Sequence, residues 1–129
     1  MTAVRALGEM ALRVTDLDKS QVFYRDVIGL DVMKRFDHAV FFRVADGYAG
    51  HTAILALFDR KVPVEQTLTT MDHIAFTIAL ADYEAERQRL EQLGVPIVMA
   101  THEWVHWRSL YVQDPDGNQV ELVCYDPAA

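Results

Sequence analysis

The feature that most constrains the fold of this chain is an internal repeat with a period of about 64 residues. Two stretches that begin at Glu9 and at His73 share one alternation of apolar and polar residues. A helix-like segment follows each stretch, and these segments end at Gly29 and Gly94, which are 65 residues apart. Two copies with so long a period do not make a solenoid. The repeat predicts two copies of one supersecondary unit that face each other, with Glu9 and His73 at equivalent strand positions.

The first copy, residues 1–58, is predicted to contain a strand, a helix and three further strands. Apolar residues at alternate positions predict a strand over residues 9–15. Asp16 or Asp18 is suited to cap a helix over residues 18–28, because a short carboxylate side chain accepts hydrogen bonds from the free N–H groups of a first helical turn. The three strands that follow are predicted over residues 30–36, 39–45 and 51–58.

The second copy, residues 72–129, repeats this order after a predicted linker over residues 59–71. A strand is expected over residues 72–79, followed by a helix over residues 81–93. That helix ends at Gly94, since glycine accepts the left-handed conformation that closes many helices. Three strands complete the copy, over residues 96–101, 107–113 and 119–125.

A tight turn is predicted between the last two strands, over Asp114–Gly117. Proline presets the first corner of such a turn, and glycine accepts a positive φ at its end. The resulting hairpin brings Tyr111 and Glu121 near each other on one face of the sheet. The order βαβββ, read twice, predicts a single α+β domain over residues 1–129, built from two modules with curled sheets.

Composition and charge argue against several kinds of function. The chain has 129 residues and a formal net charge of −7, so it has no basic stripe to neutralise the phosphates of a nucleic acid. No apolar stretch has the length of a signal peptide or a membrane span. Cys124 is the single cysteine, and a chain without an internal disulfide suits a reducing compartment. We expect a cytoplasmic protein that binds neither nucleic acid nor membranes.

Four residues of the second copy are candidates for a metal site with acid/base groups beside it. His73 and Glu121 stand in predicted strands, and His102 and Tyr111 lie between them in the sequence. Two imidazoles, a phenol and a carboxylate on one small sheet offer metal-ligand atoms and groups that move protons. The alternatives are a core histidine at position 73 and a solvated edge carboxylate at position 121.

Motifs that resemble one family are spread over nearly the whole chain: Arg13–Leu17, Phe23–Leu30, Asp72–Phe76 and Asp114–Asn118, with Glu121 close behind. In these motifs the sequence resembles the vicinal oxygen chelate superfamily. Its members include glyoxalase I, methylmalonyl-CoA epimerase, fosfomycin-modifying transferases, bleomycin-binding proteins and extradiol dioxygenases. The resemblance implies that the curled sheets of the two modules surround a metal-binding cavity.

The resemblance places metal ligands on the first strand of each module and on the last strand. On this chain those positions are Glu9, His73 and Glu121. The family more often has a histidine at the first position, so Glu9 departs from the usual pattern. A glutamate there can instead pair with Arg13 on the same face of its strand. One histidine with two carboxylates cancels the charge of a divalent cation and favours Fe(II), Mn(II) or Mg(II) over Cu(II).

Three further residues favour the extradiol dioxygenase branch of the family. His51 opens the strand before the linker, His102 lies nine residues before Tyr111, and Tyr111 lies ten residues before Glu121. By resemblance, His51 would act as acid/base near bound oxygen, while Tyr111 and His102 would hold the hydroxyls of a catechol on the metal. His106 competes with His102 for this role. The predicted function is a ring-cleaving dioxygenase for a small aromatic diol, with Fe(II) or else Mn(II) or another divalent ion as cofactor.

Two other functions stay open on the sequence. The first is a metal-dependent isomerase, lyase or transferase. Glyoxalase I and the epimerases take a fourth ligand from the strand before the linker, where residues 53–57 carry no donor atom. Fosfomycin-type transferases place basic phosphonate-binding residues after the last strand, where this chain has residues 125–129 without a base. The second is a non-catalytic small-molecule-binding protein of the resistance type, which needs no metal ligands.

The family resemblance also predicts a homodimer, because two small sheets with exposed edges favour pairing with another copy. The sequence leaves open whether the two modules of one chain close a single site. The other arrangement is an exchange of modules between two chains, which builds two sites.

Overall fold

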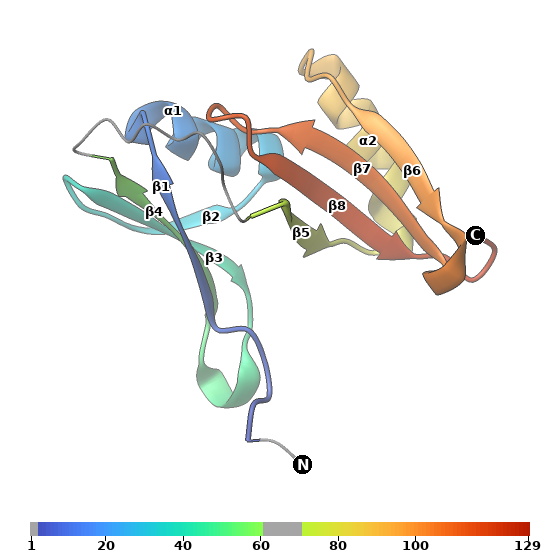
Figure 1. Ribbon diagram of the computed structural model, residues 1–129, viewed down its shortest axis with the longest axis horizontal. Helices are drawn as coiled ribbons and strands as arrows, with labels where there is room; N and C mark the ends of the chain where they lie inside the picture. The colour runs from blue at the N-terminus through green and yellow to red at the C-terminus, as the bar shows by residue number, and fades with distance from the viewer. Residues whose placement is uncertain (1–2, 61–70) are drawn as a thin grey trace. The chain divides into compact units, whose positions relative to one another are not determined.

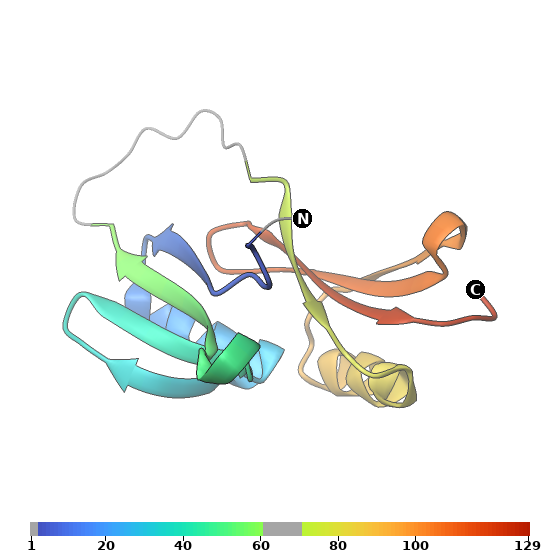
Figure 2. The ribbon, with the colours of Figure 1, turned by 90° about the horizontal axis from the view of Figure 1, so that it is seen from below.

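The computed structural model describes residues 3–60 and 71–129 (Figure 1). The chain divides into two units, Met1–Glu65 and Gln66–Ala129, which we describe one at a time. Each unit holds one four-stranded mixed sheet with helical segments after its first strand, and each sheet is curled without closing (Figure 2). This confirms the predicted α+β fold with two βαβββ modules. The predicted linker over residues 59–71 lies mostly outside the described residues.

The first unit begins with strand β1 (Glu9–Val14), which runs parallel to β4 (Ala53–Asp59). Strand β3 (Ala39–Ala45) lies antiparallel between β4 and β2 (Asp31–Arg35). The order across the sheet is therefore β1-β4-β3-β2. Three helical segments complete the unit: α1 (Leu17–Val22), η1 (Phe23–Ile28) and η2 (Tyr48–Gly50).

The single helix predicted over residues 18–28 is two consecutive segments, since α1 passes into the π-helix η1. Asp16, and not Asp18, is the N-cap: its carboxylate accepts a hydrogen bond from the backbone N–H of Lys19 at 3.0 Å. Gly29 ends the segment with a φ of 94°, as predicted. Buried residues along the two segments, Leu17, Ser20, Phe23, Tyr24 and Ile28, face the core of the unit.

The second unit repeats the arrangement. Strand β5 (His73–Thr77) runs parallel to β8 (Gln119–Tyr125), and β7 (Trp107–Gln113) lies antiparallel between β8 and β6 (Val98–His102). The order is β5-β8-β7-β6, which matches the first unit strand for strand. The helical segments are η3 (Leu80–Asp82), α2 (Tyr83–Gln92) and η4 (Glu103–Val105).

Helix α2 lies along one face of the second sheet (Figures 1 and 2). Its Tyr83 and Leu90 are buried, and the Arg108 guanidinium lies 4.1 Å from the centre of the Tyr83 ring. Cys124 on β8 belongs to this face and is 1% exposed, so it is a core residue. The opposite face of the sheet carries the candidate site.

The hairpin between β7 and β8 turns as predicted. The N–H of Gly117 donates to the carbonyl of Asp114 at 3.0 Å, and Gly117 has a φ of 81°. The Asp114 carboxylate accepts the backbone N–H groups of Asp116 and Asn118 at 2.9 and 2.8 Å. These bonds fix the register in which β7 and β8 pair. Among the helices in the described part of the chain, none combines the length and the apolar character that a bilayer crossing requires.

Candidate metal-binding and acid/base site

Strand register gathers the candidate residues of the second unit on one face. Glu121 on β8 stands opposite Ala75 on β5 and opposite Tyr111 on β7. Side chains two residues apart on a strand share a face, so His73 joins this group from β5 and Ser109 from β7. The central position of β8 in the sheet puts Glu121 in the middle of the set.

His73 and Glu121 form the centre of the site. His73 Nε2 lies 3.5 Å from Glu121 Oε1. The other nitrogen of the ring, Nδ1, hydrogen-bonds Asp72 Oδ2 at 2.6 Å. The Ser109 hydroxyl donates to Glu121 Oε2 at 3.2 Å. Each side chain thus makes a hydrogen bond through one of its two polar atoms. The other atom, which could bind a metal, faces the other side chain.

Glu121 is a buried carboxylate that forms no ion pair with Lys or Arg in the described part of the chain. Its side chain is 4% exposed, and Ser109, its hydrogen-bond donor, is fully buried. Within residues 3–60 and 71–129, His73 is the one basic side chain that contacts it. A buried carboxylate with so little compensation costs folding free energy, and a bound cation would offset that cost. The environment therefore suits a metal ligand.

Tyr111 lies between two histidines. Its hydroxyl is 2.9 Å from His102 Nε2, and its ring makes edge-on contacts with the rings of His73 and His102, each at 6.3 Å between centroids. Burial raises the pKa of the Tyr111 phenol, and the hydrogen bond to the Glu121 carboxylate and its charge raise it further. The phenol therefore stays protonated at neutral pH and can donate a hydrogen bond.

His106, the competitor for the role of His102, lies elsewhere in the second unit. It has a left-handed backbone with a φ of 57°, and its Nδ1 lies 2.7 Å from the carbonyl oxygen of Ala129. Its ring contacts Tyr125, 6.1 Å away between centroids. The structure thus places His102, and not His106, against Tyr111.

Glu9 and His51 belong to the first unit. Glu9 is exposed, and within the described residues it makes no salt bridge with Arg13. The His51 ring lies against Gly8, the residue before Glu9: a Cβ at Gly8 would stand 3.1 Å from His51 Cε1. A Cβ at Gly47 would overlap the His51 carbonyl oxygen at 1.6 Å. Close backbone packing at Gly47 therefore holds His51 beside the start of β1.

The predicted site residues therefore fall into three neighbouring pairs. His73 and Glu121 form one, Tyr111 and His102 the second, and both belong to the second unit. The third, Glu9 and His51, belongs to the first unit, where the His51 ring lies against Gly8, the residue before Glu9. No group of three His, Cys, Asp or Glu side chains suited to a metal occurs in the described part of the chain. The three-ligand set of Glu9, His73 and Glu121 stays a prediction.

Sequence reasoning missed two residues of the site. Asp72 precedes His73 directly, and a carboxylate next to a candidate metal-binding histidine is a signal that was available. Ser109 lies two residues before Tyr111, so the strand period alone puts it on the same face. Its contact with Glu121 depends on the pairing of β7 with β8. In the sequence, only the turn over Asp114–Gly117 predicts that pairing.

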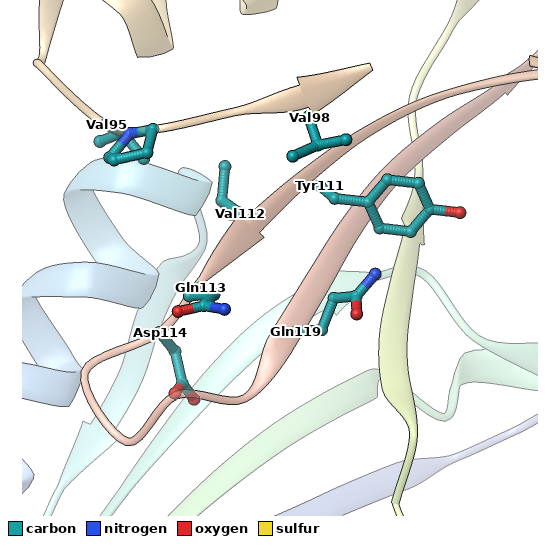
Figure 3. Close-up of a pocket in the computed structure, with 8 residues that line it drawn as sticks. Val95, Val98, Tyr111, Val112, Gln113, Asp114 and Gln119 are labelled. Carbon is teal, nitrogen blue, oxygen red and sulfur yellow. The ribbon is translucent and has the colours of Figure 1, made fainter. Parts of the chain in front are cut away.

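A hollow of about 710 Å³ adjoins Tyr111 in the second unit (Figure 3). Val95, Pro96 and Val98 line it from the start of β6 and the loop before it. The remaining wall comes from the hairpin: Tyr111, Val112, Gln113, Asp114 and Gln119.

Comparison with known proteins agrees with this architecture. The family model described as Glyoxalase/Bleomycin resistance protein/Dioxygenase superfamily matches residues 6–122. Glutathione transferase FosA of Serratia marcescens is 31% identical over 119 residues, which are 92% of this chain and 80% of that protein. Metallothiol transferase FosB of Staphylococcus haemolyticus is 27% identical over 121 residues, 92% and 83% of the two chains. The crystal structure of lactoylglutathione lyase from Agrobacterium tumefaciens is 28% identical, with a TM-score of 0.68 over 95% of this chain and 96% of that one.

Proposed function

The chain belongs to the Glyoxalase/Bleomycin resistance protein/Dioxygenase superfamily, and we propose that it is a metal-dependent transferase that adds a thiol to a small electrophilic substrate. The names of its relatives, a glutathione transferase and a metallothiol transferase, support this class of reaction. The observation in this chain that carries the proposal is the contact of 3.5 Å between His73 Nε2 and Glu121 Oε1.

The donor atoms of this pair fit a divalent cation. An imidazole nitrogen and a carboxylate oxygen face each other, and Glu9 is proposed as the third ligand. A metal-binding histidine commonly hydrogen-bonds a carboxylate through its other ring nitrogen, and Asp72 has this position beside His73. A bound cation would supply Lewis acidity toward an oxygen atom of the substrate. This role asks for a divalent metal and not for Fe(II) in particular.

Tyr111 and His102 would act on the same substrate oxygen. The protonated phenol of Tyr111 can donate a hydrogen bond to an oxygen that becomes negative during the reaction. When His102 Nε2 carries the ring proton, it donates to the phenol oxygen at 2.9 Å. The single phenol O–H, which donates to the Glu121 carboxylate, would then turn to the substrate oxygen. His102 then orients the hydroxyl that Tyr111 presents.

The reaction is an addition in which no group is lost. With an epoxide as the electrophile, a carbon–sulfur bond forms while one carbon–oxygen bond of the strained ring breaks. The thiol proton ends on the released oxygen, which becomes a hydroxyl. His51 is the proposed base for the thiol, because an imidazole accepts and returns a proton near neutral pH.

The extradiol dioxygenase predicted from the sequence is the second candidate. The contact between His102 and Tyr111 favours it, since that pair was expected to hold a catechol. The named relatives favour the transferase instead. Fe(II) and an aromatic diol therefore belong to this second candidate alone.

One experiment separates the two candidates. Protein purified without chelator is analysed for metal, then loaded with Mn(II) or Mg(II) and incubated with glutathione and an epoxide. We expect loss of free thiol, measured with a chromogenic disulfide, to depend on both protein and metal. In parallel, Fe(II)-loaded protein is mixed with catechols in an oxygen electrode. Oxygen uptake without thiol consumption would reject the transferase in favour of the dioxygenase.

We also propose that the protein is a cytoplasmic homodimer that works on small molecules. Edge strands β2 and β6 each leave one side unpaired within their own sheet, which favours association with another copy. Sedimentation equilibrium at micromolar concentration measures the mass directly. A monomer alone would reject the dimer and any site shared between chains.

A further inference from the structure

The hollow beside Tyr111 has the size of a small-molecule site. Its volume of about 710 Å³ lies within the range of about 300–1,000 Å³ that ligand pockets occupy. Figure 3 shows the Tyr111 ring at one end of the hollow, with Val98 above it and Gln119 below. The Tyr111 hydroxyl points away from Val95 and Asp114, so a ligand in the hollow would meet the reactive groups at the Tyr111 end.

The walls of the hollow suit an uncharged, mainly apolar ligand. Val95, Pro96, Val98 and the Tyr111 ring supply apolar surface, while the amides of Gln113 and Gln119 can donate and accept hydrogen bonds. With the phenol of Tyr111, these two glutamines are the neutral polar side chains among the eight that line it.

Charge points the same way. None of the eight residues that line the hollow in the described second unit is Lys, Arg or His, and one of them, Asp114, is a carboxylate. The Asp114 oxygens accept N–H groups of Asp116 and Asn118, which keeps this carboxylate at the floor of the turn. Phosphonates and carboxylates are held in proteins by Arg, Lys or arrays of backbone N–H groups. An anionic ligand would therefore find no positively charged side chain among these eight residues, and the Asp114 carboxylate would repel it.

We propose that this hollow binds the body of the electrophilic substrate, and that the substrate is uncharged and largely apolar, with a polar group that the Gln113 and Gln119 amides hydrogen-bond. This substrate class rests on the proposed thiol addition and differs from a phosphonate such as fosfomycin. The thiol, if it is the doubly carboxylated glutathione, binds outside the hollow.

Binding is tested without any reaction. Styrene oxide, an uncharged aryl epoxide, is titrated into ¹⁵N-labelled, metal-loaded protein without thiol, and fosfomycin is titrated into a second sample. We expect styrene oxide to shift the side-chain amide resonances of Gln113 and Gln119, and fosfomycin to leave them in place. Shifts caused by fosfomycin alone, or by neither epoxide, would overturn the proposal.

A matched pair of variants tests the same site by kinetics. Val98 and Met99 are neighbours on β6 with similar exposure, 66% and 59%, but only Val98 lines the hollow. Val98→Trp fills the hollow and should raise KM for styrene oxide by about tenfold or more. Met99→Trp adds the same bulk on the other face and should leave KM unchanged. Equal effects of the two substitutions would overturn the assignment of the hollow.

A substitution that adds a positive charge gives the last test. Gln113→Arg introduces a guanidinium into the wall and should raise kcat/KM for fosfomycin relative to styrene oxide. A wild type that already prefers fosfomycin would reject the uncharged substrate class. Amide shifts with styrene oxide but no thiol consumption with either epoxide would instead reject the proposed transferase and keep the hollow as a binding site.

Discussion

Ala56 in the first unit occupies the place that Glu121 takes in the second. The two sheets have the same strand order, so their registers can be compared position by position. In the first unit Ala56 stands opposite Phe41, and in the second Glu121 stands opposite Tyr111. One copy of the repeat therefore has an alanine and a phenylalanine where the other has a carboxylate and a phenol.

The positions around these pairs also carry apolar side chains in the first unit and polar side chains in the second. The rings of Phe36 and Phe58 both pack edge-on against Phe41, each 5.9 Å away between centroids, and they make an aromatic cluster in the first unit. The second unit has Ser109 and the two histidines around Tyr111. Strand pairing needs only backbone groups and an apolar core face, so the other face of each sheet is free to diverge. The repeat has kept its topology in both units and concentrated the polar chemistry in one.

The largest effect is expected where the second unit supplies a metal ligand. His73→Ala removes the imidazole nitrogen that faces Glu121 and should abolish metal binding, measured by metal analysis after gel filtration. Circular dichroism should remain that of wild type, because the His73 side chain is exposed. His38→Ala, at an exposed histidine of the first unit, is the control and should keep the metal.

Glu9→Ala tests whether the first unit contributes to this centre. If Glu9 is the third ligand, metal affinity falls steeply in this variant too. If Glu9→Ala keeps the metal affinity of the wild type, all the metal ligands lie in the second unit, and the first unit takes no part in metal binding. Near-stoichiometric metal in His73→Ala would contradict this comparison, since the metal would then bind somewhere other than the His73–Glu121 pair of the second unit.

Tyr111→Phe gives the second unit the residue that the first has at Phe41. We expect the rate of thiol addition to fall by about 10²–10⁴-fold, the usual contribution of a general acid or base, while metal content is unchanged. Tyr125→Phe, at an exposed tyrosine at the end of β8, should have no effect. Equal rates in wild type and Tyr111→Phe would show that the phenol has no chemical role.

The pH dependence of Tyr111 follows from its pKa. Since burial and the Glu121 carboxylate raise this pKa above that of an ordinary phenol, the protonated form that donates the hydrogen bond persists through neutral pH. The contribution of Tyr111 to the rate should therefore be lost only at alkaline pH, above the ordinary phenol value of about 10. This alkaline decline should be absent from the residual rate of Tyr111→Phe.

Ser109→Ala also makes the second unit resemble the first, which has Ala39 at the equivalent position. The substitution removes the hydroxyl that holds Glu121 Oε2, and loss of such a support typically lowers metal affinity by about 10–100-fold. Isothermal titration with Mn(II) measures it. Ser20 in the first unit is buried as well, but its hydroxyl has no hydrogen-bond partner in the described residues. Ser20→Ala should leave metal affinity unchanged, and an equal loss in both variants would reject the specific role of Ser109.

Much of this comparison could be predicted from the sequence because it depends on local rules. Alternating apolar residues located the eight strands of residues 3–60 and 71–129 to within a few residues. The Asp-Pro-Asp-Gly turn paired β7 with β8 in the correct register. That register placed Tyr111 opposite Glu121. The sequence left His102 and His106 as alternatives, and the structure places the His102 ring beside Tyr111.

What the sequence did not reveal depends on hydrogen bonds between side chains or on competing local conformations. The contacts of Asp72 and Ser109 with the candidate ligands require rotamers that no pattern encodes. The helix expected over residues 18–28 is α1 followed by the π-helix η1, whose Phe23 and Tyr24 are buried. The predicted site residues also leave the branch of the family open, since the His102–Tyr111 pair fits more than one reaction.

The smallest expected effect compares the first helices of the two units. Asp16 caps α1 with its carboxylate, whereas Asp82 precedes α2 in a helical conformation and its side chain makes no capping hydrogen bond. Asp16→Ala should lower the free energy of unfolding by about 0.5–2 kcal/mol, the usual cost of losing an N-cap side chain. Asp82→Ala should cost only a few tenths of a kcal/mol, as for an ordinary surface substitution. Urea denaturation followed by far-UV circular dichroism measures both. Asp82 is the last residue of the 3₁₀ segment η3, whereas Asp16 has an extended backbone. Equal losses in the two variants would therefore mean that α2 is also capped by its aspartate in solution, and the two units would then start their helices alike.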